Sequence, residues 1–102
     1  MNELEIKQIK KELAEVRYYY LRKKKFADGR KLVGVNSIEF TVEKYNEAVK
    51  SAPAQLYDIY IGLYVEGNTQ TGYASELGYS PIYIYQLNRK LIAFFQNKLK
   101  EN

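Results

Sequence analysis

Residues 69–90 read TQTGYASELGYSPIYIYQLNRK, and this stretch predicts two helices joined by a tight turn. Thr69, or the residue before it, can cap the first helix through a side-chain oxygen. Gly78 tolerates the positive φ that a tight turn between helices requires. Ser80 can cap the second helix, and Pro81 then occupies the first helical position, where proline is favoured. Two capped helices with so short a connection predict a helix-turn-helix.

The spacing inside this stretch supports the same prediction. It follows the pattern Q-x3-A-x3-G-x5-I-x2-L, which is typical of helix-turn-helix proteins and falls here on Gln70, Ala74, Gly78, Ile84 and Leu87. A small residue at Ala74 allows the two helices to cross closely. The apolar contacts expected to fix the crossing angle are Tyr73, Leu77, Ile84 and Leu87.

Upstream, residues 3–26 predict one long helix, because apolar residues recur there at alternating spacings of three and four. They are Ile6, Ile9, Leu13, Val16 and Tyr20. The favoured interpretation is a helix packed on its own domain. The alternative is a short coiled-coil seam that makes a dimer.

Between this helix and the helix-turn-helix, two further helices are expected. Asp28-Gly29 is a turn signal, and residues 30–40 are ambiguous between a short strand and a hydrophobic loop. Thr41 can cap a second helix, and a third opens near Pro53 and ends at Glu66-Gly67-Asn68. Beyond the motif, the last helix continues with core or dimer residues, namely Leu91, Phe94, Phe95 and Leu99.

The predicted fold class is therefore all-α. A long N-terminal helix and a basic connecting segment occupy residues 1–40, and a helical domain with a C-terminal helix-turn-helix occupies residues 41–102.

Length and composition narrow the function further. The chain has 102 residues, enough for one domain, and its 46% hydrophobic content argues against wholesale disorder. Cysteine and histidine are absent, which excludes disulfides and disfavours zinc sites and histidine-dependent catalysis. No apolar run approaches the roughly 18 residues of a membrane span, and the N-terminus lacks a secretion signal. We expect a cytoplasmic protein with no membrane association and no cofactor.

No enzymatic site is expected either. Glu43 and Glu47 share a helix face, but carboxylates at this spacing are usually solvent-exposed rather than a working pair. Residues 62–67 lack the Lys-Ser/Thr of a phosphate-binding loop.

The positive charge is unevenly distributed. Residues 1–50 carry 12 Lys/Arg and 8 Asp/Glu, whereas residues 51–102 carry 4 of each, so the net charge of +4 lies in the first half. Basicity of this kind fits phosphate binding. The strongest cluster is the run Arg22, Lys23, Lys24 and Lys25.

Three segments resemble a known family. LYVEGNT (63–69), ASELGYS (74–80) and IYQLNRK (84–90) look like region 4 of sigma factors, and still more like the small phage-encoded regulators built on that region, including activators of late transcription. The resemblance covers about the last half of the chain. It implies DNA binding in the major groove and, as in the activator members, contact with host RNA polymerase.

In helix-turn-helix docking, the start of the second helix faces base edges and the first helix crosses the DNA backbone. The outward positions of the helix that starts near Ser80 are Pro81, Ile82, Tyr83, Tyr85, Gln86 and Arg89. Gln86 is expected to pair with adenine, Arg89 with guanine or a phosphate, and Ile82 with thymine methyl groups. The phosphate candidates are Gln70, Thr71 and Lys90.

Each of these assignments has a structural alternative. Tyr83 and Tyr85 can pack against the N-terminal helix, and Gln86 can be an ordinary solvated side chain. Relatives tend to carry arginines just after the serine that opens the second helix, where this chain has Pro81 and Ile82. We therefore expect the run 22–25 to supply phosphate contacts, unless it is simply a solvated helix end that complements the helix dipole.

Three functions remain open from the sequence. The first is a phage or mobile-element transcription regulator that binds double-stranded DNA as a homodimer. The second is a DNA-packaging component of the small-terminase kind, which would assemble as a ring. The third is a protein-interaction module that keeps the fold and binds host RNA polymerase or another host protein. The uncharged, tyrosine-rich start of the second motif helix favours this third function, because interfaces are enriched in aromatic residues and depleted in charge.

Overall fold

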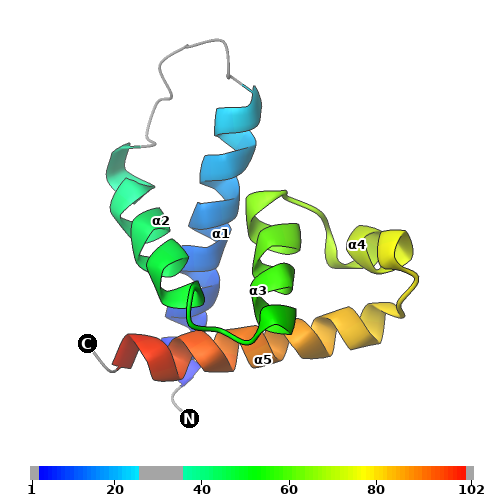
Figure 1. Cartoon of the computed structure of the whole chain (residues 1–102). Coiled ribbons are helices and arrows are strands. Elements are labelled where there is room, and N and C mark those ends of the chain that lie inside the picture. The colour runs from blue at the N-terminus through cyan, green and yellow to red at the C-terminus, as the bar shows by residue number, and fades with distance from the viewer. Residues whose placement is uncertain (1–2, 26–35, 101–102) are drawn as a thin grey trace.

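The chain folds as a succession of helices (Figure 1), and the computed structural model describes residues 3–25 and 36–100. No strand occurs within those ranges, so the all-α prediction is confirmed. In chain order the elements are α1 (Glu3–Lys25), α2 (Asn36–Val49), α3 (Ala54–Tyr60), the π-helical segment η1 (Ile61–Val65), α4 (Gln70–Leu77) and α5 (Pro81–Lys100). None of the helices in these ranges has the length and apolarity that crossing a bilayer requires.

Helix α5 runs across one end of the other helices and contacts α1, α2, α3 and α4 (Figure 1). Its C-terminal half meets the start of α1, where Glu5 accepts a hydrogen bond from Gln96 at 3.3 Å and pairs with Lys100 at 3.5 Å. Its N-terminal half carries the contact with α4. One helix therefore belongs both to the core and to the predicted helix-turn-helix.

The core is a single cluster of buried side chains drawn from every helix. Phe95 of α5 is fully buried at its centre, with ring centroids 4.7 Å from Tyr45 of α2 and 5.7 Å from Tyr60 of α3, both edge-to-face. The hydroxyl of Tyr60 donates to Asn46, whose amide donates in turn to Tyr20 of α1. Aromatic packing thus joins α2 and α3 to α5, and a part-buried hydrogen-bond chain joins α1, α2 and α3.

The apolar stripe of α1 faces this core. Ile9, Leu13 and Val16 are buried, and Ile6 and Tyr20 pack against the cluster while partly exposed. The interpretation that this helix packs on its own domain is confirmed. A dimer through the same stripe would require α1 to leave the core.

Helix α2 starts earlier than predicted. Thr41 lies inside it rather than at its cap, and residues 36–40 are helical rather than a strand or loop, so both predictions were wrong. The reason is that Ile38 extends the inward face of Val42, Tyr45 and Val49 by one more turn, and all four are buried. The predicted turn at Asp28-Gly29 and residues 30–35 lie outside the described residues.

The third helix ends as predicted, with a positive φ of 79° at Gly67, but its last turn widens into η1. Asn68 explains this ending: its backbone N–H and its side-chain amide both donate to the carbonyl of Gly62, at 3.2 and 2.9 Å. The sequence pattern predicts a helix here but gives no sign of the wider turn.

A polar cluster joins α1 to α2 around Glu12. Its carboxylate accepts hydrogen bonds from the Tyr45 hydroxyl at 2.6 Å and from Lys44 and Gln8 at 3.0 Å each. Burial by itself raises the pKa of Glu12, but the hydrogen bonds from Tyr45, Gln8 and Lys44, with the charge of Lys44, bring it below the ordinary value of 4.5. Burial, and then the hydrogen bond to Glu12, raise the pKa of Tyr45. The ionised carboxylate and the neutral phenol therefore stabilise the native state together.

We expect acid to weaken the fold through this cluster. Because the folded-state pKa of Glu12 lies below its unfolded value, the stabilisation is present above about pH 4.5 and is lost as the pH falls through the folded-state value. Urea unfolding of the wild type and of Glu12→Gln, measured from neutral pH to about pH 3, checks this. The difference between the two proteins should shrink in acid, and parallel curves would contradict the prediction.

Candidate nucleic-acid interface

Helices α4 and α5 form the predicted helix-turn-helix, with the predicted caps. The Thr69 hydroxyl oxygen accepts from the backbone N–H of Gly72 at 2.9 Å, and the Ser80 hydroxyl oxygen accepts from the N–H of Tyr83 at 3.2 Å. Gly78 has a φ of 76°, and the N–H groups of Gly78 and Tyr79 close the C-terminus of α4 on its last carbonyls. Pro81 is the first residue of α5. These four features confirm the turn chemistry predicted from the sequence.

The crossing of the two helices is tight and mostly as predicted. Ala74, Ile84, Leu87 and Tyr73 are buried between α4, α5 and the helices behind them. Leu77 is different: its side chain is 45% exposed, so the prediction that it fixes the crossing angle was wrong. It is the last residue of α4, beyond the point of crossing, and it faces the groove between α3 and α4.

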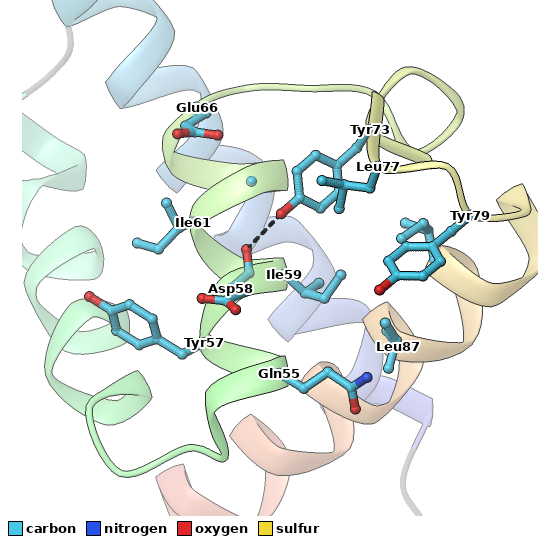
Figure 2. A pocket seen from close by; sticks show the side chains of 12 residues that line it. Gln55, Tyr57, Asp58, Ile59, Ile61, Glu66, Tyr73, Leu77, Tyr79 and Leu87 are labelled. Carbon is cyan, nitrogen blue, oxygen red and sulfur yellow. Dashed lines mark hydrogen bonds between the residues drawn. The ribbon is translucent and has the colours of Figure 1, made fainter. Parts of the chain in front are cut away.

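A contact that the sequence did not reveal sets the position of α4. The ring of Tyr73 lies directly on the backbone of η1 at Gly62, where an added Cβ would be only 2.3 Å from the ring carbon Cζ. The Tyr73 hydroxyl also approaches the carbonyl oxygen of Asp58, at 3.4 Å (Figure 2). Only glycine permits this approach, so Gly62 determines how closely α4 can pack on α3 and η1.

The start of α5 presents a free outward face. Ile82 is 68% exposed, and Gln86 and Arg89 are also exposed. Their spacing of four and three places them opposite the buried stripe of Ile84, Leu87 and Leu91. Three of the predicted base readers therefore share one face, which we call the α5 outer face. Ser80, Pro81, Thr71 and Lys90 are also exposed, and Gln70 is half-buried.

The two tyrosines of this region behave differently. Tyr83 turns toward α3, where its hydroxyl is 2.6 Å from the amide nitrogen of Gln55, and its ring packs on Tyr79 with centroids 4.9 Å apart. It is half-buried and does not join the α5 outer face. Tyr85 is 53% exposed at the side of that face. The alternative that Tyr83 and Tyr85 pack against the N-terminal helix was therefore wrong, because Tyr83 packs on α3 and Tyr85 is exposed.

The basic run of α1 lies apart from the α5 outer face. Glu5 at the start of α1 touches α5, and the helix then runs away from it (Figure 1). At 1.5 Å per residue, Arg22 is roughly 25 Å farther along α1 than Glu5. Arg22 lies over the ring of Tyr18 and Lys23 over that of Tyr19. The side chains of Lys24 and Lys25, like Arg30 and Lys31, lie outside the described residues.

The charge of α5 itself suits a nucleic acid. The helix contains no Asp or Glu and four basic residues, which are Arg89, Lys90, Lys98 and Lys100. Residues 51–102 are neutral overall because acidic residues outside α5 offset the positive charge of that helix. Within the described ranges, no group of acidic side chains could hold a metal ion.

Comparison with known proteins returned no relative: no family model matches the chain, and neither a search of curated proteins nor a search of solved structures found a match.

Proposed function

We propose that this protein is a DNA-binding transcription regulator that places the start of α5 in the major groove. The observation that carries the proposal is the capped α4–α5 pair with an exposed outer face at the start of its second helix. In such a docking, α4 lies across the DNA backbone and the first turns of α5 face the base edges.

The α5 outer face has side chains suited to reading bases. The amide of Gln86 can pair bidentately with adenine, Arg89 can pair with guanine, and Ile82 can contact a thymine methyl group. From Ile82 to Arg89 the helix rises by roughly 10 Å, which corresponds to about three base steps. Thr71 and Lys90, which are exposed, and Gln70, which is half-buried, are the candidates for phosphate contacts.

Electrostatics add to this docking. The absence of acidic residues from α5 leaves no repulsion of phosphate along that helix. The basic end of α1 lies away from α5 (Figure 1). It would therefore contact only DNA that extends or bends beyond the major groove in which α5 is docked. The resemblance of residues 63–69, 74–80 and 84–90 to phage activators supports a regulator of that kind, acting in a host cytoplasm with host RNA polymerase.

A second candidate is a protein-interaction module on the same helices. It is favoured by four exposed apolar or aromatic residues close to the turn, which are Leu77, Tyr79, Ile82 and Tyr85. Aromatic and apolar residues of this kind are enriched at protein interfaces. This candidate predicts no selection of DNA sequence.

The deciding experiment is selection of bound sequences from random duplex DNA at two salt concentrations. An enriched motif, with affinity that falls steeply as salt rises, supports a sequence-specific regulator. Binding without enrichment points to a packaging or architectural role. Absence of binding at low salt would overturn the proposal in favour of a protein partner.

Substitutions on the α5 outer face should then change the selected motif. Arg89→Ala and Gln86→Ala are each expected to weaken specific binding by about 1–3 kcal/mol and to relax the preference at one base position. Asn97→Ala is the matched control, because Asn97 is an exposed amide on the same helix far from its start. Equal losses for Gln86→Ala and Asn97→Ala would contradict the assigned docking.

A further inference from the structure

The connection between η1 and α4 is held from two sides. On the side of η1, Asn68 donates its two hydrogen bonds to the carbonyl of Gly62. On the side of α1, the guanidinium of Arg17 donates to the carbonyl of Gly67 at 2.7 Å, in a part-buried bond between residues 50 positions apart in the chain. Asn68 and Thr69 alone separate Gly67 from the first residue of α4, so a contact that fixes Gly67 also places the start of that helix.

Leu21 adds an apolar contact at the same point. It lies one helical turn beyond Arg17 on the same face of α1. An added Cβ at Gly67 would be only 2.6 Å from Cδ2 of Leu21, so the leucine side chain rests directly on the glycine backbone. Arg17 and Leu21 together therefore hold the turn at Gly67 against α1.

Arg17 also lies near the contact between η1 and α5. The Tyr64 hydroxyl of η1 donates to the buried Asn88 of α5 at 2.6 Å. Burial raises the pKa of Tyr64, while the hydrogen bond to Asn88 and the positive charge of Arg17 oppose that rise. The guanidinium thus occupies the place where α1 meets η1, close to the attachments of both motif helices.

We infer that Arg17 is a positioning residue of the DNA-reading unit, which fixes the start of α4 relative to α5 without itself contacting DNA. In the proposed docking, α4 crosses the DNA backbone while α5 enters the groove, so the two helices must keep a fixed relation for both sets of contacts to form. Helix α4 has eight residues and packs on α5 and η1, and its start therefore depends on the connection that precedes it. The effect on DNA rests on the proposed function, whereas the hold of Arg17 on α4 can be measured without DNA.

Hydrogen exchange of the full chain tests the hold on α4. Arg17→Met keeps most of the apolar stem and removes the donor, so the α4 amides should exchange about tenfold faster or more, as expected when a hydrogen bond from a charged group is lost. The amides of α2 should exchange as in the wild type, and Arg17→Lys, which keeps a charged donor, should stay closer to the wild type. Lys11→Met is the matched control, because Lys11 is an exposed basic residue of the same helix. An unchanged α4, or an equal acceleration in α2 and α4, would overturn the inference.

DNA binding by the folded protein, measured well below its unfolding temperature, tests the consequence. The affinity of Arg17→Met for the selected duplex should fall by about three- to tenfold, which is the value of one or two hydrogen bonds to phosphate. Because the α5 outer face is anchored by its own buried stripe, the selected sequence should stay the same. The salt dependence should also stay the same, since a slope reduced by about one would instead identify Arg17 as a direct phosphate contact and refute the positioning role.

Failure of this inference and failure of the proposed function give different results. If the wild type binds DNA and folded Arg17→Met binds it equally well, the proposed function stands, but Arg17 only stabilises the fold and the inference is wrong. If the wild type binds no DNA, the proposed function is wrong, and exchange of the α4 amides still decides whether Arg17 holds that helix in place.

Discussion

Replacing Phe95 with alanine is expected to lower the free energy of unfolding by about 3–5 kcal/mol. The side chain has no exposed surface and is enclosed by the rings of Tyr45, Tyr60 and Phe94. Its removal deletes the edge-to-face contacts with all three rings and leaves a cavity at the point where α2, α3 and α5 meet. Urea unfolding followed by circular dichroism measures the loss. Because small domains are typically stable by only about 5–15 kcal/mol, the variant should be close to unfolding.

Phe94 provides the comparison for this prediction. It is the neighbouring ring on the same helix, but it is only partly buried at the edge of the core. Phe94→Ala should therefore cost clearly less than Phe95→Ala. A similar loss for both, or a loss below about 1 kcal/mol for Phe95→Ala, would show that Phe95 is not the centre of the core.

Replacing Gly62 with valine is expected to destabilise the fold by on the order of 3 kcal/mol and to weaken the proposed DNA binding at the same time. Even a Cβ at this position would lie 2.3 Å from the Tyr73 ring, and the valine methyl groups add to that overlap. The ring must then move away from η1, and α4 moves with it. Because α4 sets how α5 is presented, the displacement should appear in DNA affinity measured on the fraction that remains folded.

A double-mutant cycle with Tyr73→Ala isolates this effect. With the ring removed, Gly62→Val meets no obstruction, so it should cost much less in that background than in the wild type. An unchanged cost would mean that the loss comes from the backbone of η1 rather than from the contact with Tyr73.

The parts of the fold that depend on local chemistry were predictable from the sequence. The caps at Thr69 and Ser80 and the turn at Gly78 each require a particular residue type at a particular position, so their pattern identified the helix-turn-helix. The stripe of α1 was equally clear, because a helix buried on one side repeats its apolar residues at three and four.

Other features depend on tertiary packing, and there the sequence was misleading or silent. Thr41 has good capping chemistry, yet α2 continues through it because Ile38 gains a place in the core. Leu77 was expected to fix the crossing of the two helices, but at the end of α4 its side chain is 45% exposed. The approach of Tyr73 to Gly62 joins residues of different helices, and neither position shows a local signal.

In the candidate site too, features set by local sequence were predictable and features set by tertiary packing were not. The spacing of Ile82, Gln86 and Arg89 placed them correctly on one exposed face. The run beginning at Arg22 stays a prediction for phosphate contacts, and its distance from the α5 outer face follows from the direction of α1, which no local pattern encodes. The groove between α3 and α4 was not foreseen, because its walls come from separate helices.

Since α5 is a single unbroken helix, repacking around the buried Phe95 would tilt the whole helix about that residue as a pivot. The distance from Phe95 to Ile82 along the axis is roughly 20 Å, so a tilt of about 5° at the pivot would displace the tip by nearly 2 Å. That is enough to misalign a hydrogen bond with a base edge. In the proposed docking, the fidelity of base reading would then depend on residues that never approach the DNA, and substitutions in the core could change the preferred DNA sequence without altering the contacting surface.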